Sequence, residues 1–332
     1  MSASDLAGEL RVLREAAGLV ALPGRGVIEV TGSERVRWLD GMVSQDVKAA
    51  AARGPGAGAY ALVLTQKGRI VADLHLLALE DALWLELERA AIPGVQAHLD
   101  RYIIADDVTL RDASEEIARL AVEGPRAAEA VSDALDGGAG PEPEGFVEAR
   151  LGGATVRVAA WGFLGEHGRQ VFAPAAEAAN VEAALLEAGA GAGLAPVGEE
   201  AFHVRRVEVG TPWPGHELDE SVLPAEARLE RAVSTTKGCY TGQEVVARLR
   251  SRGRRNHLLV GLRFEGPAPS PGAALEAEGR KAGEVTSVAE PPESGPIGLG
   301  FVKAELAEPG TRLALEGGAA VRVCPLPFDD AA

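Results

Sequence analysis

The sequence predicts an α+β protein whose chain ends in a small antiparallel β-barrel. Within residues 26–135, strand patterns alternate with helix patterns, and several strands follow one another through short turns, which favours hairpins over βαβ units. From His257 onward, short apolar strands are separated by Pro/Gly turns, which is the spacing of a small barrel. No Gly-x-Gly-x-x-Gly or Walker loop follows a predicted strand, so the pattern argues against a nucleotide cofactor.

The individual elements follow from hydrophobic periodicity along the chain. Alternating apolar residues predict strands at 26–30, 60–65, 70–79, 82–87, 107–111, 117–122 and 154–161. Apolar residues at helical spacing, with a capping residue or proline near several starts, predict helices at 34–43, 93–102, 125–135, 175–187, 199–209 and 223–233. Residues 136–145 form an acidic connector, and barrel strands are expected at 258–264, 283–288, 297–302, 313–315 and 320–323.

The composition is that of a globular protein with an acidic surface. Of 332 residues, 46% are hydrophobic and 25% are charged, and the formal net charge is −16. An average surface of that sign repels phosphate, so we expect neither direct nucleic-acid binding nor binding to anionic membranes. Residues 1–20 carry charges throughout, and no uncharged apolar run approaches the roughly 18 residues of a membrane span. We therefore expect a cytoplasmic protein.

Cysteines and histidines do not form a metal-binding pattern. Cys239 and Cys324 are too few for a disulfide framework or a four-thiolate site. The histidines show neither His-x-x-x-His nor His-x-x-Glu-His spacing, and they stand at 75, 98, 167, 203, 216 and 257. No metal held by this chain alone is expected.

The segment Lys237-Gly-Cys-Tyr-Thr-Gly-Gln-Glu244 is the most distinctive part of the chain. It places Cys239 beside Lys237 and between Gly238 and Gly242. A thiol next to fixed positive charge loses its proton more easily, so Cys239 is a candidate nucleophile, with Lys237 as its catalytic neighbour. The alternative is that Cys239 is a small buried residue at a turn, since cysteine is often buried.

Together with the following Val-Val-Ala-Arg-Leu, this segment resembles the signature of the YgfZ family of folate-binding proteins. That family is tied to iron–sulfur cluster assembly and repair and to tRNA modification, and it shares its fold with the glycine-cleavage T-protein, an aminomethyltransferase. The resemblance covers nearly the whole chain and is strongest at 199–252. It implies two interleaved α+β domains within residues 1–250, a barrel domain at 251–332, and tetrahydrofolate or another reduced folate as the cofactor.

Asp73 lies within the strand expected at 70–79, where an acid either faces solvent or meets a ligand. T-proteins have Gly-Gly-apolar-apolar-Asp-Asp in this position, and an aspartate there helps to position folate and the amine substrate. This chain has Gly68-Arg-Ile-Val-Ala-Asp73, so Ala72 replaces one acid of the pair. The difference puts aminomethyl transfer in question and leaves folate binding open.

Arg206, Glu208, Gly210 and Pro212 match the T-protein run Arg-x-Glu-x-Gly-x-Pro, whose glutamate hydrogen-bonds the pterin ring of folate. A carboxylate suits that task because it accepts two parallel N–H bonds from an aminopyrimidine edge. The alternative is that Glu208 forms a helix-surface salt bridge with Arg205.

Arginines occupy every second position from 248 to 254. On a strand they would face one side and form a positive stripe. That stripe is either a solvated surface or a site for an anion, such as the glutamate tail of folate, an acidic partner or tRNA phosphate. The residues that we expect to bind folate are Asp73, Glu208, Arg206, Tyr240 and Arg250.

Three functional hypotheses follow. The first is a tetrahydrofolate-binding accessory factor for iron–sulfur cluster assembly and iron–sulfur-dependent tRNA modification, with iron–sulfur proteins or assembly machinery as partners. In it, Cys239 and Lys237 face the same cleft as Asp73 and Glu208. The second is a folate-dependent aminomethyltransferase of the glycine-cleavage type. The third is a folate-free scaffold that binds a partner through its arginines.

Overall fold

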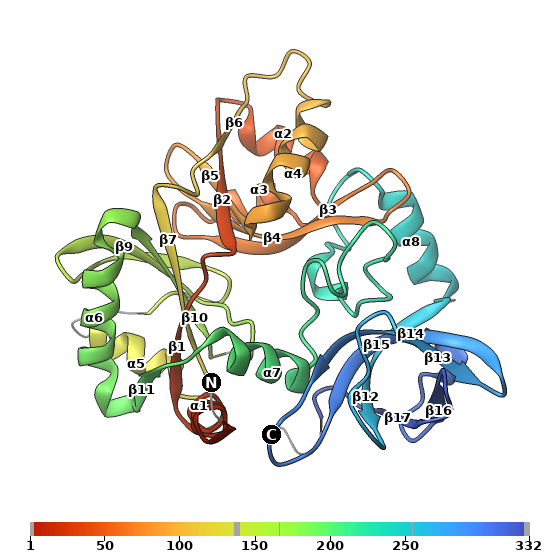
Figure 1. Cartoon of the computed structure of the whole chain (residues 1–332). Coiled ribbons are helices and arrows are strands. Elements are labelled where there is room, and N and C mark those ends of the chain that lie inside the picture. Colours follow the sequence, from red (N-terminus) through yellow and green to blue (C-terminus); the bar gives the residue numbers. More distant parts are fainter. Residues whose placement is uncertain (1–2, 136–139, 166, 254, 329–332) are drawn as a thin grey trace.

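Two β-sheets and a β-barrel form three lobes around a common centre in the computed structural model of the chain (Figure 1). The structure describes residues 3–135, 140–165, 167–253 and 255–328. The expected α+β class with a C-terminal antiparallel barrel is confirmed.

The first sheet is antiparallel and has the strand order β3–β4–β5–β2–β6. Its strands are β2 (Arg25–Thr31), β3 (Gly58–Leu64), β4 (Ile70–Ala78), β5 (Leu83–Glu88) and β6 (Thr109–Asp112). Between β3 and β4 the chain turns at Gly68, whose φ of 71° is one that glycine adopts without strain. One face is covered by α2 (Arg35–Met42), α3 (Val47–Ala52) and α4 (Ile92–Asp100).

The opposite face of this sheet turns polar side chains toward the centre of the molecule. Tyr60 pairs with His75 across β3 and β4, and His75 pairs with Glu86 across β4 and β5. Asp73 lies two residues from His75, so the alternation of the strand places its side chain on the same face. The hairpin expected from the sequence therefore delivers Asp73 to the interior rather than to solvent, where it is 6% exposed.

The second sheet has the order β11–β1–β7–β10–β9–β8 and is antiparallel except for the pair β1–β11. Its strands are β1 (Ala17–Ala21), β7 (Ile117–Glu123), β8 (Phe146–Leu151), β9 (Ala154–Ala159), β10 (Arg169–Pro174) and β11 (Leu194–Pro196). Helices α5 (Ala127–Ala134) and α6 (Ala178–Ala188) pack against it. The chain begins this sheet with β1, builds the first sheet, and returns at β7, so the two α+β units are interleaved as expected.

The third lobe is a closed barrel of order β12–β15–β14–β13–β16–β17. Its strands are β12 (His257–Phe264), β13 (Ala274–Ala277), β14 (Arg280–Ala289), β15 (Ile297–Lys303), β16 (Arg312–Leu315) and β17 (Ala320–Cys324). Helix α7 (Glu199–Val209) packs against α1 (Ala3–Glu15) on one side and against β14 and β15 on the other. It therefore joins the barrel to the rest of the molecule (Figure 1).

One expected helix is wrong, and the segment whose arginine spacing would suit a strand is helical. Residues 223–233 form hydrogen-bonded turns and the short 3₁₀ turn Glu230–Ala232 rather than a helix, since Arg228 adopts a left-handed φ of 60° that interrupts a helical path. Residues 243–252 form helix α8 (Gln243–Arg252) rather than a strand. Because a helix turns about 100° per residue, Arg248 and Arg250 leave it on different sides instead of along one stripe.

Besides α8, seven helices and strands of the described residues have no counterpart among the expected ones, namely α1, β1, α3, β8, β10, β11 and β13. Part of the expected connector at 136–145 lies outside the described residues. Within the described ranges, no helix combines the length and the apolar character needed to cross a bilayer.

Candidate functional site

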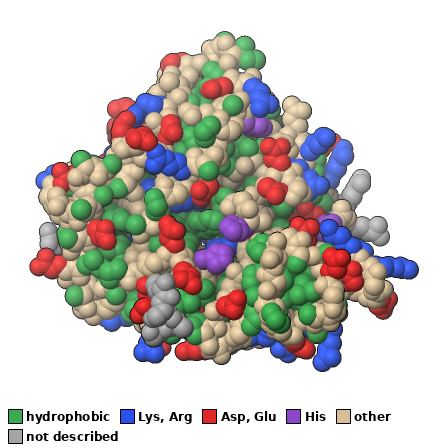
Figure 2. All heavy atoms as spheres, viewed as in Figure 1, with side chains coloured by type: hydrophobic (Ala, Val, Ile, Leu, Met, Phe, Trp, Pro, Cys, Tyr) green, Lys and Arg blue, Asp and Glu red, His purple; other side chains and the backbone are tan. Residues whose placement is uncertain are grey.

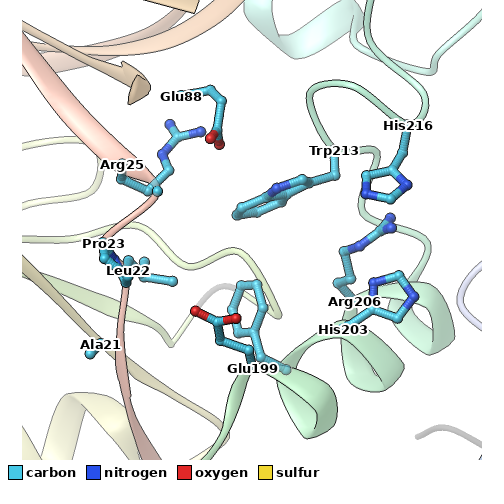
Figure 3. A pocket seen from close by; sticks show the side chains of 12 residues that line it. Ala21, Leu22, Pro23, Arg25, Glu88, Glu199, His203, Arg206, Trp213 and His216 are labelled. Carbon is cyan, nitrogen blue, oxygen red and sulfur yellow. The ribbon is translucent and has the colours of Figure 1, made fainter. Parts of the chain in front are cut away.

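Two adjoining hollows lie where the lobes meet, and together we call them the central cleft. The inner hollow, of about 640 Å³, is lined by residues that include Arg25, Phe202, His203 and Arg206 (Figure 3). The acidic hollow, of about 1040 Å³, is lined by residues that include Asp73, Asp219 and Glu220. The residues that line both are Glu88, Trp213 and His216. On the face drawn in Figure 2, histidine side chains gather at this junction.

Arg25, the first residue of β2, is buried at one wall of the inner hollow. Its Nε and Nη2 donate to Glu86 at 2.9 and 2.8 Å. Burial opposes the charge of this guanidinium, but Glu86 raises the pKa of Arg25 above its ordinary value. The remaining nitrogen, Nη1, is buried and has no hydrogen-bond partner among the described residues. A buried N–H without a partner is costly, so Nη1 is a donor suited to a ligand.

Glu86 joins Arg25 to a second buried arginine. It is fully buried, and its Oε1 accepts Nη2 of Arg119 at 3.0 Å. Burial alone would keep this carboxyl neutral, but the two guanidiniums hold the pKa of Glu86 well below its usual range. The charges at the base of the cleft are therefore fixed by mutual pairing.

The buried network continues from Arg119 through Gln170 to Glu123. Arg119 donates to the Gln170 Oε1 at 3.3 Å, and the Gln170 Nε2 donates to Glu123 at 3.0 Å. Glu123 also accepts the backbone N–H groups of Phe163 and Leu164 at 2.9 and 3.1 Å. Burial raises the pKa of Glu123 to about 7, although its hydrogen bonds with Phe163, Leu164 and Gln170 oppose that shift. The network thereby holds the loop that carries Phe163 against the cleft.

Asp73 lines the acidic hollow and has one oxygen without a partner among the described residues. Its Oδ2 accepts the Tyr60 hydroxyl at 3.0 Å. Burial and the Asp73 charge raise the pKa of Tyr60 well above its ordinary value, so the phenol remains a donor. Oδ1 of Asp73 is buried and has no partner among the described residues. Tyr60 therefore orients a carboxylate whose second oxygen is left to accept a bond from a ligand.

Glu88 and Trp213 lie at the boundary between the two hollows. Glu88 ends β5, and burial raises the pKa of its carboxyl, although Arg25 opposes that shift. Figure 3 shows this carboxylate on the same wall as the Arg25 guanidinium, with the Trp213 ring reaching into the space beside them. Trp213 packs edge-on against Phe163 and Phe202, at ring distances of 5.1 and 5.4 Å. A carboxylate and a guanidinium beside an aromatic ring fit a flat ligand with hydrogen-bonding edges.

Helix α7 points two of the expected folate residues in different directions. Arg206 lines the inner hollow, where Nη1 donates to Glu217 at 3.0 Å. Glu208 lies outside the residues that line the central cleft, and its carboxylate accepts Nη2 of Arg14 at 2.5 Å and Nη1 of Arg205 at 2.9 Å. The salt bridge considered as the alternative for Glu208 is therefore present, and Arg14 extends it.

Cys239 lies away from the central cleft, in a shallow outer hollow formed by Gly41, Gln66, Tyr102 and residues 239–244. Its side chain is exposed, not buried at a turn. The expected arrangement, in which the thiol faces the same cleft as Asp73, is not present, because the two side chains line different hollows.

Lys237 is occupied by the end of α2 rather than by the thiol. Its buried amino group donates to the backbone carbonyls of Asp40, Val43 (2.9 Å) and Gln45 (2.8 Å). Burial lowers the pKa of Lys237, and Asp40 opposes this. Since Asp40 lies in the last turn of α2 and Val43 and Gln45 follow it, Lys237 acts as a cap for that helix.

The other two residues expected at the folate site also lie outside the central cleft. The ring of Tyr240 lies 5.2 Å from the Lys237 amino group and lines the outer hollow. Arg250 is exposed on α8. Of the seven expected site residues, the structure therefore brings Asp73 and Arg206 to the central cleft.

Several residues that line the cleft were not singled out by the sequence. Trp213 and His216 belong to the irregular Gly/Pro-rich run 210–220, and a tryptophan in such a run is a signal that could have drawn attention to it. Arg25 and Glu88 carry no local signal, because they become neighbours only when β2 pairs with β5.

Family models identify the chain as a relative of the glycine-cleavage T-protein. The GCVT N-terminal domain matches residues 2–237, and the glycine cleavage T-protein C-terminal barrel domain matches residues 258–330. The chain therefore belongs to the glycine-cleavage T-protein family.

Individual relatives agree with that family. The chain is 32% identical to an aminomethyltransferase of Saccharopolyspora erythraea, over 97% of this chain and 89% of the relative. It is 32% identical to an aminomethyltransferase of Rubrobacter xylanophilus, over 98% of this chain and 86% of the relative. The crystal structure of glycine cleavage system aminomethyltransferase T from Bartonella henselae superposes with a TM-score of 0.84 at 24% identity, covering 98% of this chain and 90% of that one. The last comparison supports the shared fold.

Proposed function

We propose that this chain binds a reduced folate in the central cleft and takes part in folate-dependent aminomethyl transfer. The single observation that carries the proposal is a pair of buried atoms without a partner among the described residues, Arg25 Nη1 and Asp73 Oδ1, in the two hollows that Trp213 lines. The names of the relatives favour this activity over an accessory role in iron–sulfur metabolism.

The chemistry of the lining fits a pteridine. That ring presents an aminopyrimidine edge with N–H donors next to a carbonyl acceptor. Asp73 and Glu88 supply carboxylates for the donors, and the free Arg25 nitrogen supplies an N–H for the acceptor. Trp213 offers an aromatic surface for the flat ring. The cleft therefore offers hydrogen-bonding partners for both the donors and the acceptor of the aminopyrimidine edge.

Tetrahydrofolate, when bound, supplies the two secondary amines that accept the methylene group of an aminomethylated thiol carrier, with release of ammonia and the free thiol. In this chain the charge of Asp73, whose carboxylate is buried and fixed by Tyr60, favours a positively charged donor amine beside the bound ring. Ala72 replaces the other acid of the T-protein pair. Of these two positions, only Asp73 can therefore stabilise the positive charge of the donor amine.

The test is ammonia release from an aminomethylated lipoyl carrier in the presence of tetrahydrofolate. We expect activity from the unchanged chain and a loss of about 100-fold or more in Asp73→Asn, because removing one preorganised charged group costs about that factor. Asp133→Asn, at an exposed position on α5, is the matched control and should behave as wild type. Folate binding without any ammonia release from the unchanged chain would contradict aminomethyl transfer.

A second candidate, the iron–sulfur accessory role, is favoured by one specific observation. Cys239 stands exposed at the surface in a segment that resembles the YgfZ signature. A thiol so placed is accessible to an iron–sulfur protein or to assembly machinery while folate occupies the separate central cleft. This candidate predicts that Cys239→Ala fails to restore iron–sulfur enzyme activity in a deletion strain, although it binds folate normally. Full restoration by Cys239→Ala would exclude the thiol from such a role.

A further inference from the structure

His203 and His216 form a pair at the end of the inner hollow opposite Arg25 and Glu88. His203 lies on α7 and His216 in the loop that follows, and their ring centres are 5.9 Å apart. His216 is exposed and His203 is partly buried, so the pair stands at the mouth of the hollow. Figure 3 shows the two rings on either side of Arg206, facing the wall that carries Arg25.

Both imidazoles lie beside the same strand of the barrel, and His203 is hydrogen-bonded to it. The Nε2 of His203 donates to the Val288 carbonyl at 3.0 Å, and the ring of His216 lies near the backbone of Thr286. A neutral imidazole that donates one N–H to a carbonyl has its other nitrogen as an acceptor, and this nitrogen becomes a second donor on protonation. Strand β14 therefore holds two side chains that can each gain a donor and a positive charge.

The two ends of the central cleft differ in charge. The acidic hollow carries several carboxylates, whereas His203 lines the inner hollow beside Arg206, whose charge is compensated by Glu217, and His216 lies at the boundary of the two hollows. Burial and the Arg206 charge lower the pKa of both histidines. The charged groups that face the pair from the surrounding elements are Arg206, Glu217, Glu199, Arg25, Glu88, Asp219 and Glu220.

We propose that His203 and His216 bind the carboxylates of the folate glutamate tail, so that the ligand lies with its ring at Asp73, Glu88 and Arg25 and its tail at the histidines. The proposal rests on the proposed function for the ligand. It follows from matching polarity: the ring needs acceptors for its N–H groups, which the acidic end supplies, and the tail needs donors, which the histidine end supplies.

This orientation makes the affinity for the tail depend on pH. A bound carboxylate favours the protonated imidazole and raises its pKa, so binding takes up protons. The tail carboxylates stay ionised above about pH 5. Affinity for the tail therefore rises as pH falls from 8 to 6. Titration of Glu88 affects ring binding, so a ligand with the ring and no tail is the proper reference.

The experiment is equilibrium binding of tetrahydrofolate and of 6-methyltetrahydropterin, which has the same ring and no glutamate tail, at pH 6 and pH 8. The affinity for tetrahydrofolate divided by the affinity for 6-methyltetrahydropterin should be about fivefold higher at pH 6 than at pH 8. This is the size expected for a charge pair at a partly exposed site. In His203→Gln/His216→Gln, the ratio should be the same at both pH values. Glutamine keeps a donor for the Val288 carbonyl, and His257→Gln, at an exposed position on β12, should match wild type.

The outcomes separate this inference from the proposed function. If the affinity ratio for wild type does not change with pH while both ligands bind, the placement of the tail is wrong and folate binding stands. If the double variant keeps the wild-type pH dependence, the histidines are not the donors. If neither ligand binds at either pH, the proposed function itself fails.

Discussion

The central cleft and the outer hollow around Cys239 both contain residues that the sequence singled out, but their polar groups are in different states. In the central cleft, Asp73 is 6% exposed and Arg25 is 3% exposed, and each has a buried atom without a partner among the described residues. In the outer hollow, Cys239 is open to solvent, and the amino group of the nearby Lys237 has its carbonyl partners. The central cleft therefore has buried polar atoms without partners among the described residues. At the outer hollow, the polar groups are either hydrogen-bonded or exposed to solvent.

This difference indicates where a small ligand belongs. A buried donor or acceptor without a partner costs free energy that a bound molecule recovers, whereas an exposed group has water as its partner. The central cleft is therefore suited to hold a small polar molecule, and the outer hollow is suited to contacts at the surface. The predictions below change each region in turn, beginning with the largest expected effect.

The first prediction compares a charge at the base of the cleft with one beside the outer hollow. Glu86→Gln leaves Arg25 and Arg119 as buried cations without a counter-ion, so we expect the free energy of unfolding to fall by about 3–5 kcal/mol. Glu244→Gln removes an exposed pair with Arg248, so the change should stay below about 1 kcal/mol. Urea unfolding of both variants measures the difference. Equal losses would mean that the buried network does not support the cleft.

The second prediction concerns Lys237. Lys237→Met leaves three backbone carbonyls at the end of α2 without their donor, so we expect a loss of about 2–3 kcal/mol in the free energy of unfolding. Folate affinity should be unchanged, because Lys237 lies outside the central cleft. Lys67→Met, at an exposed position, serves as the control. Intact stability with lost folate binding would return Lys237 to a ligand-binding role.

The third prediction is a pH dependence of stability set by Glu123. Its pKa is about 7 in the folded chain and 4.5 without burial, so the folded state holds the proton more tightly. The stabilisation is complete below about pH 4.5 and is lost as pH rises through 7. Relative to Glu123→Gln, wild type should therefore lose about 2 kcal/mol of unfolding free energy between pH 5.5 and pH 7.5. A constant difference between the two proteins across this range would show that Glu123 does not titrate there.

Much of the architecture could be predicted because it depends on local periodicity. The β3–β4 hairpin and the barrel follow from apolar alternation and Pro/Gly turns. Helix α8 could not be placed in the same way, because an arginine at every second position imitates a strand. Glycines at 242 and 253, with φ of 84° and 65°, instead bound a helix whose Glu244 and Arg248 pair one turn apart.

The candidate site could be predicted only in part. Asp73 was found because its strand and its T-protein pattern are both local in the chain. Glu208 matched a T-protein pattern equally well, but Arg14, 194 residues away in sequence, engages its carboxylate. Arg25 and Glu88 meet only after β2 and β5 pair. Groups that depend on distant partners leave no mark in a short sequence window.

The most direct test of a folate site in the central cleft is the affinity for tetrahydrofolate of wild type, Asp73→Asn and Cys239→Ser. We predict that Asp73→Asn weakens binding by about 10- to 100-fold, the value of a charge-assisted hydrogen bond, and that Cys239→Ser binds as wild type. Loss of binding in Cys239→Ser, with Asp73→Asn unaffected, would contradict the account and move the ligand to the outer hollow.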